Sequence, residues 1–165
     1  MYAQLNTKTV FSFMDATVKL TDYITAAKTL GYQTLGISDV DNLHAAHQFI
    51  TQAKAAGIQP VIGYETTLLL DGLAINFTFI AKTNAGLQNL YSISSKKNFG
   101  YNNFSDIHSH LCDVALILPA DSAVDSILTH LPQNDVFVGL AQPMAQGFLR
   151  PTIPFLSVRY LNAGD

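Results

Sequence analysis

The sequence predicts an α/β fold, a distorted (β/α)7 barrel of the TIM type formed as a single domain. Strand-like and helical periods alternate over most of the chain, which is typical of α/β folds with a largely parallel sheet. The 165 residues suffice for one domain with a substantial core. Hydrophobic residues make up 48% of the chain and charged residues 13%, which indicates deep burial and a surface that other domains cover. The same periodicity is compatible with an open doubly wound sheet.

The first part of the chain contains a βαβ unit. Gly31 follows a helical pattern and is a typical residue just after a helix end. Asp39 and Asp41 follow an apolar strand and are expected to cap the next helix. The expected elements are a strand at 3–5, a helix over 20–27, a strand at 34–37, a helix over 43–53 and a strand at 61–64.

The regular alternation changes after this unit. Residues 66–80 predict a β-hairpin with Asp71-Gly72 as its turn. The later elements are expected to be a helix around 87–91, a polar loop over 97–103, a short helix from Ser105, a strand at 114–118, a helix over 123–131, and strands at 136–140 and 153–157. We count seven of these segments as candidate strands of a barrel.

Composition excludes several classes of function. The formal net charge is −3 and no run of Lys or Arg could follow a phosphate backbone, so little direct DNA contact is expected. The single cysteine, Cys112, excludes a disulfide framework and a multi-cysteine zinc site. The sequence also lacks a signal peptide at its start and a membrane-length apolar stretch. These features predict a cytoplasmic domain with no membrane contact.

Five motifs along the chain resemble, in order, the motifs of one known protein family. The first, LNTKTVFSFMDA at residues 5–16, is similar to the family pattern L-H-x-H-T-x-Y/F-S-x-x-D-G. It keeps Asp15 but has Asn6 and Lys8 where the family has histidines. This first match therefore preserves the skeleton of the motif and loses two metal ligands.

The three central motifs follow in the family's order. LGISDVDNL resembles I-T-D-H-x-N-L and keeps Asp39, with Val40 at the histidine position. GIQPVIGYET resembles G-I-K/Q-P-I/V-I/L-G-x-E, which puts Glu65 where a bridging carboxylate would sit. NFTFIAKTNAGLQNL resembles H-L-x-L-L-A-x-N-x-x-G-x-x-N-L, with Asn76 at the leading histidine.

The last motif, IPFLSVRYLNAGD, resembles the segment that closes the barrel in the family. Ser157 and Arg159 stand where the family has an Asp and a His. Over residues 1–165 the chain thus resembles the PHP (polymerase and histidinol phosphatase) domain at the N-terminus of bacterial DNA polymerase III alpha subunits. The resemblance implies the PHP fold. It also implies a degenerate site, in which the family's metals are lost and no cofactor is bound. The positions of this site are Asn6, Lys8, Asp15, Asp39, Val40, Glu65, Asn76, Ser157 and Arg159.

Two of the replacements introduce positive charge where divalent cations would stand. Lys8 and Arg159 offer hydrogen-bond donors only. We expect them to take the place of the metals by pairing with Glu65, Asp39 or Asp15 at the mouth of the barrel, because uncompensated carboxylates there would repel each other.

The resemblance implies a catalytically inactive structural and interaction module of a DNA replication enzyme. DNA-directed DNA synthesis, a nucleotidyl transfer, would belong to palm, fingers and thumb segments that residues 1–165 do not contain. The implied partners are the remainder of the polymerase chain and replisome proteins such as a proofreading exonuclease. One alternative is a metal-dependent phosphoesterase or 3′–5′ exonuclease of the same fold, against which the missing histidines argue. Another is an unrelated binding protein that holds an anion between Lys8 and Arg159.

Overall fold

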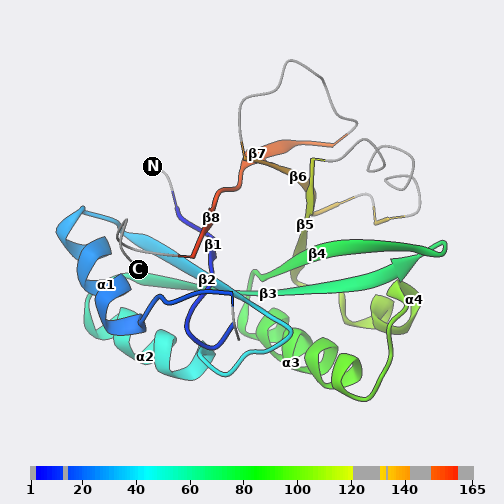
Figure 1. Cartoon of the computed structure of the whole chain (residues 1–165), viewed down its shortest axis with the longest axis horizontal. Coiled ribbons are helices and arrows are strands. Elements are labelled where there is room, and N and C mark those ends of the chain that lie inside the picture. Colours follow the sequence, from blue (N-terminus) through cyan, green and yellow to red (C-terminus); the bar gives the residue numbers. More distant parts are fainter. Residues whose placement is uncertain (1–2, 13–14, 121–130, 133, 142–149, 160–165) are drawn as a thin grey trace.

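The computed structural model describes residues 3–12, 15–120, 131–132, 134–141 and 150–159. Its centre is a six-stranded sheet with the strand order β2-β3-β4-β5-β6-β7 (Figure 1). These strands are β2 (Thr34–Val40), β3 (Gln59–Leu70), β4 (Leu73–Ala81), β5 (Val114–Pro119), β6 (Val136–Leu140) and β7 (Thr152–Pro154). Two further short strands, β1 (Asn6–Thr7) and β8 (Ser157–Val158), pair in parallel with each other.

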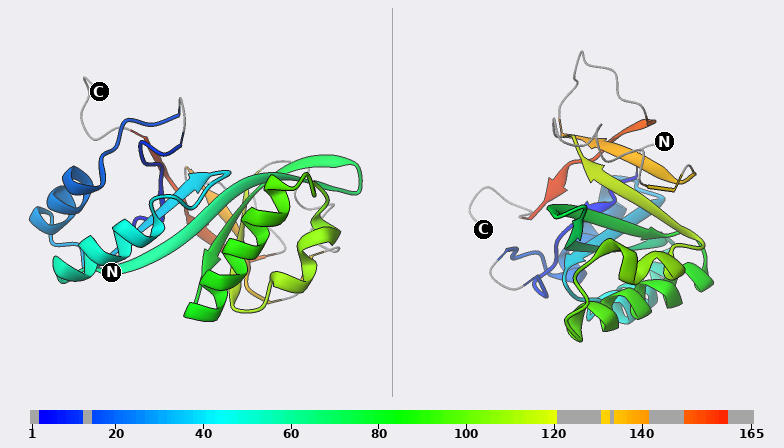
Figure 2. Two further views of the ribbon diagram at one scale, coloured as in Figure 1. Left: turned by 90° about the horizontal axis from the view of Figure 1, so that it is seen from below. Right: turned by 90° about the vertical axis from the view of Figure 1, so that its right-hand side faces the viewer.

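The helices pack on one side of this sheet. They are α1 (Leu20–Thr29), α2 (Ala46–Ala55), α3 (Asn84–Asn98), α4 (Phe104–Ile107) and the short 3-10 helix η1 (His108–His110). Figure 2 shows two groups, with α1 and α2 in blue and cyan and with α3 and α4 in green. No helix in the described part of the chain has the length and apolar character needed to cross a bilayer.

The sheet is mixed rather than largely parallel, which corrects the prediction from periodicity. β3 pairs antiparallel with β4, and β4 antiparallel with β5, whereas the other pairs of the sheet are parallel. The reason is the predicted hairpin, which is confirmed. Its turn residues Asp71 and Gly72 have φ values of 52° and 80°, the left-handed region that a two-residue hairpin turn requires.

The sheet curls so that its two ends approach each other. At one end, the backbone N–H of Gly36 in β2 donates to the carbonyl of Gln4 at 2.7 Å, just before β1. At the other end, only Phe155 and Leu156 separate β7 from β8, which is paired with β1. The chain is thus an α/β domain with a curled, half-barrel sheet (Figure 1).

Several predicted boundaries were wrong. The strand expected at 3–5 is a bridge at Gln4 followed by β1, and the strand expected at 153–157 is divided into β7 and β8. α3 is longer than predicted and includes part of the expected polar loop, and α4 begins one residue before Ser105. The predicted helix over 123–131 lies outside the described residues except for Leu131.

The two aspartates do not cap α2, which also corrects the prediction. The N-cap of α2 is Ala45, with no side-chain hydrogen bond. Asp39 lies inside β2, and Asp41 has a φ of 54° and accepts a hydrogen bond from the hydroxyl of Thr66 at 2.5 Å. Both carboxylates are therefore used to hold loops and strands around the end of β2.

The main apolar core lies on the helix side of the sheet, whereas the other side carries buried polar side chains beside apolar ones such as Ile80 and Ile117. Phe77 in β4 stacks with Phe79 and with Phe104 of α4, with ring centroids 5.8 and 5.0 Å apart. On the concave side, however, one of the largest fully buried side chains is Lys8. A buried lysine needs partners, and these define the site.

Candidate functional site

The predicted site residues gather where the parallel strands end. Lys8 follows β1, and Asp39 and Val40 end β2. Glu65 in β3 pairs with Val40 of β2 on one side and with Thr78 of β4 on the other. The carboxyl ends of parallel strands are the usual position of functional side chains in barrel folds.

Lys8 lies at the centre of the cluster and is 0% exposed. Its Nζ donates to Glu65 Oε2 at 2.6 Å, to Asn6 Oδ1 at 2.7 Å and to the carbonyl oxygen of Ser38. An ammonium group has three donors and no acceptor, so these bonds satisfy it fully. The predicted ion pair between Lys8 and Glu65 is present.

Two opposing effects act on this ammonium group. Burial lowers the pKa of Lys8 because it removes the charge from water, and this effect is the larger one. The nearby carboxylates of Glu65, Asp39 and Asp15 raise the pKa. The charge on Lys8 therefore depends on the carboxylates that surround it.

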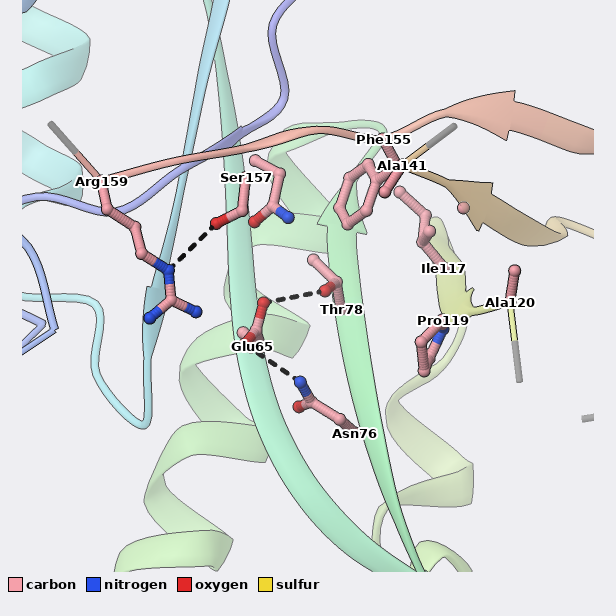
Figure 3. Close-up of a pocket in the computed structure, with 12 residues that line it drawn as sticks. Glu65, Asn76, Thr78, Ile117, Pro119, Ala120, Ala141, Phe155, Ser157 and Arg159 are labelled. Carbon is pink, nitrogen blue, oxygen red and sulfur yellow. Dashed lines mark hydrogen bonds between the residues drawn. The ribbon is translucent and has the colours of Figure 1, made fainter. Parts of the chain in front are cut away.

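Glu65 uses both of its carboxylate oxygens within the protein. Oε2 accepts from Lys8 and from the Thr78 hydroxyl, the latter at 3.4 Å. Oε1 accepts from Asn76 Nδ2 at 3.1 Å, as Figure 3 shows. Asn76 stands at a histidine position of the family pattern and here supplies a donor to the carboxylate.

Asp39 holds the loop that follows β1. Its Oδ1 accepts from the Thr9 backbone N–H at 2.6 Å and from the Ser12 hydroxyl at 2.7 Å. Its Oδ2 accepts from the Thr9 hydroxyl at 2.7 Å. The Ser12 hydroxyl in turn accepts from the backbone N–H of Val40 at 3.1 Å, so this aspartate fixes the loop against the end of β2.

Thr9, Ser12 and Thr78 were not predicted as site residues. Thr9 and Ser12 matched the first family motif, but their role as partners of Asp39 depends on the tertiary fold. Thr78 is placed beside Glu65 by the register of β3 and β4. The sequence would have indicated Thr78 only if its pattern had fixed which residues of β3 and β4 pair. Of the predicted residues, Val40 contributes backbone hydrogen bonds only among the described interactions.

Arg159 lies at the rim of the cluster. It forms the predicted ion pair with Asp15, and its Nε lies 3.4 Å from the Ser157 hydroxyl. The Arg159 side chain is 44% exposed and that of Asp15 is 26% exposed. The two basic residues therefore serve different carboxylates, one buried and one at the surface.

We expect Arg159→Ala to lower the free energy of unfolding by no more than about 1 kcal/mol, because exposed ion pairs are screened by water. Chemical denaturation with guanidinium chloride measures this change, with Asp15→Ala as its matched partner. A loss of about 3–5 kcal/mol, the usual cost of breaking a buried ion pair from one side, would contradict the assignment of Arg159 to the rim.

A cavity opens beside the cluster. It has a volume of about 580 Å³. Figure 3 shows polar side chains on one side and apolar ones on the other. The lining residues are Asn6, Glu65, Asn76, Thr78, Ile117, Pro119, Ala120, Gly139, Ala141, Phe155, Ser157 and Arg159. No group of three or more His, Cys, Asp or Glu side chains in the described residues is arranged to hold a metal ion.

Comparison with known proteins identifies one family and a consistent set of relatives. Residues 4–138 match the model of the PHP domain. The whole chain is 35% identical over 168 residues to the N-terminal region of the DNA polymerase III subunit alpha of Streptococcus pyogenes serotype M3. Its counterpart in Staphylococcus epidermidis is 40% identical over 96 residues, which cover 58% of this chain and 9% of the relative.

The match is to a small part of these relatives. The chain spans 16% of the length of the streptococcal protein. Among solved structures, a protein of Bifidobacterium adolescentis with the provisional name metal-dependent phosphoesterase has a TM-score of 0.47 and 18% identity. That alignment covers 57% of this chain and 32% of the other. A TM-score of this size is too low to bear on function.

Proposed function

The chain belongs to the PHP domain family, and we propose that it serves as a metal-free structural and interaction module of a DNA polymerase III alpha chain. The observation that carries this proposal is the bond between Lys8 Nζ and Glu65 Oε2, 2.6 Å long and buried. The lysine thus neutralises the carboxylate that would otherwise be available to a divalent cation.

The donor set does not fit the metals that the family implies. A two- or three-metal phosphoesterase site needs neutral imidazoles and carboxylates with free lone pairs. Here Glu65 accepts from Lys8, Thr78 and Asn76, and Asp39 accepts from Thr9 and Ser12. A cation bound to Glu65 would also lie near the buried Lys8 ammonium, and like charges repel strongly in a buried site. The proposed role therefore involves no metal-dependent step.

The role within a longer chain is the second part of the proposal. DNA-directed DNA synthesis would be carried out by other segments of a polymerase that acts in the cytoplasm. This domain would pack on the rest of that chain and offer a surface to replisome proteins such as a proofreading exonuclease. The similarity to alpha subunits over the full length of the chain supports this role.

We also propose that the curled sheet completes a distorted (β/α)7 barrel. Three features support it: the bridge from Gln4 to Leu35, the pairing of β1 with β8, and the two-residue link between β7 and β8. If residues 152–158 are counted as one interrupted strand, the pairing passes from β2 through β7 and back to β1.

The metal-free state predicts that the purified chain, incubated with excess Mn²⁺ or Zn²⁺ and desalted, carries no stoichiometric metal by mass spectrometry. It should also fail to hydrolyse bis(4-nitrophenyl) phosphate. The control is a variant that restores the family ligands, with Asn6→His, Lys8→His, Val40→His, Asn76→His, Ser157→Asp and Arg159→His. That variant should gain metal if it folds, since deprotonated imidazoles and carboxylates are the ligands that such ions prefer. Stoichiometric metal or turnover in the parent chain would favour the phosphoesterase or exonuclease alternative.

A further inference from the structure

A second, smaller pocket lies where the segment that joins β2 to α2 meets α3 (Figure 1). Its volume is about 220 Å³, below the roughly 300–1,000 Å³ of typical small-molecule sites, so it suits a single side chain better than a whole ligand. The lining residues are Asp41, Asn42, Leu43, His44, Tyr91, Ser94, Ser95 and Asn98. We propose that this pocket receives an arginine side chain from a partner protein.

Helical spacing explains the wall that α3 contributes. Tyr91, Ser94, Ser95 and Asn98 recur at intervals of three and four residues, which places them on one face of the helix. The opposite wall is the segment after β2, and Figure 2 shows α2, which follows it, as the neighbour of α3. Two segments that are far apart in the sequence therefore enclose the pocket.

The pocket carries a negative charge that no described residue balances. Asp41 forms no ion pair within the described part of the chain. Lys96 and Lys97, in the last turn of α3, are engaged elsewhere, since the first lies over an aromatic ring and the second donates to a carbonyl and a carboxamide. The ring of His44 packs against Phe11, with centroids 6.4 Å apart. A cation is therefore the complementary ligand.

The other groups in the lining favour a guanidinium over an ammonium. Tyr91 is 42% exposed, so part of its ring is available to a planar cation, which aromatic rings attract. Ser95 and Asn98 add side-chain oxygens at the C-terminal end of α3, where the helix dipole is negative. A guanidinium has five N–H donors in one plane, whereas an ammonium has three donors, so an arginine can use more of these acceptors.

A buried hydroxyl beside the pocket supports the same assignment. No hydrogen bond of good geometry satisfies the Tyr64 hydroxyl among the described residues, although the hydroxyls of Thr66 and Ser94 lie near it. Burial, and then the nearby charge of Asp41, raise the pKa of Tyr64 to about 12. The negative potential of Asp41 thus extends into the protein beneath the pocket, where a bound cation would offset it.

The test is a titration of the purified chain, followed by backbone amide NMR shifts. The probes are N-acetylarginine amide and N-acetylcitrulline amide, which have similar length and a planar end group but differ in charge. We expect the arginine amide at millimolar concentration to shift the amides of Asp41 and of the pocket-facing side of α3. The citrulline amide should bind at least about tenfold more weakly, because its hydrogen bonds lack the assistance of charge. N-acetyllysine amide should fall between the two.

Two variants and two matched controls locate the binding. Asp41→Asn preserves the shape of the side chain and tolerates the φ of 54° at this position, and it should make the arginine and citrulline amides bind alike. Tyr91→Leu should weaken binding of the arginine amide about two- to fivefold, as expected for an exposed cation–π contact. The controls, Asp22→Asn and Tyr101→Leu, change an exposed acid and an exposed ring outside the pocket lining and should bind as the parent chain does. The dispersion of the amide spectrum checks that each variant is folded.

Several results would overturn the proposal. They are the absence of any shift with the arginine amide, equal binding of the arginine and citrulline amides by the parent chain, and unchanged binding in Asp41→Asn. Free arginine and Ca²⁺ are titrated in parallel. Tighter binding of free arginine than of its amide would mean that the pocket recognises the amino acid rather than a protein segment. Shifts with Ca²⁺ alone would mean that it is a metal site.

This inference rests on the proposed interaction role, for which it specifies the chemistry of a partner, but it does not depend on the metal-free state. Stoichiometric metal in the parent chain would contradict the proposed function and would leave the arginine titration as expected. Failure of the arginine titration would remove this partner chemistry and would leave the metal analysis unchanged. The two experiments therefore fail separately.

Discussion

Replacing Lys8 with alanine is expected to lower the free energy of unfolding by about 3–5 kcal/mol, the usual result of breaking a buried ion pair from one side. The substitution leaves the carboxylate of Glu65, which is 9% exposed, without its closest partner. It also removes the donor to Asn6 and to the Ser38 carbonyl. Guanidinium denaturation followed by circular dichroism measures the loss.

Two further variants separate charge from packing in this prediction. Lys8→Met keeps most of the side-chain volume and should still be strongly destabilising, because Glu65 remains unpaired. Adding Glu65→Gln to Lys8→Met removes the unpaired charge and should recover part of the stability, since a buried pair can often be replaced by uncharged groups.

The matched control for Lys8 is Lys82, which forms an ion pair of similar length with Asp135. That bond is 2.8 Å long, but both side chains are at least 40% exposed. We expect Lys82→Ala to unfold at nearly the same denaturant concentration as the parent chain, because solvent screens the pair. Equal losses for Lys8→Ala and Lys82→Ala would mean that the central lysine does not hold the site together.

The gathering of basic and acidic side chains at the site could be predicted because it follows from motif positions. Lys8 and Glu65 both occupy positions that surround a shared metal in the family pattern, so their convergence in space followed from the resemblance. Opposite charge then favours contact between them. The prediction left Glu65, Asp39 and Asp15 open as partners of both Lys8 and Arg159, and the tertiary fold assigns Glu65 to Lys8 and Asp15 to Arg159.

The remaining errors arise where tertiary structure overrides local pattern. An aspartate after an apolar strand is a common helix cap, but the loop after β1 brings Thr9 and Ser12 to Asp39 and uses its carboxylate instead. Similarly, residues 153–157 read as one strand, yet pairing with β6 ends at Pro154 and pairing with β1 begins at Ser157. A local sequence pattern does not indicate where a segment stops pairing with one strand and begins to pair with another.

Asp39→Ala is expected to be the second strongly destabilising change, with a loss of about 3 kcal/mol or more, because hydrogen bonds to a charged acceptor contribute about 1.5–3 kcal/mol each. Asp39 is 2% exposed and accepts three such bonds from Thr9 and Ser12. Without it, the buried N–H and hydroxyl of Thr9 and the hydroxyl of Ser12 lose their acceptor. Asp22→Ala, on the exposed face of α1, is the control and should have a small effect.

A local measurement distinguishes this role from general loss of packing. Amide hydrogen exchange at Thr9 and Val40 should accelerate in Asp39→Asn, because both N–H groups depend on the carboxylate, directly or through the Ser12 hydroxyl. Amides in the centre of β4 should change only as much as global stability does. If Thr9 and Val40 stay protected while the whole domain loses stability evenly, then the carboxylate does not hold the loop. In that case the residues of the first motif would contribute to packing alone.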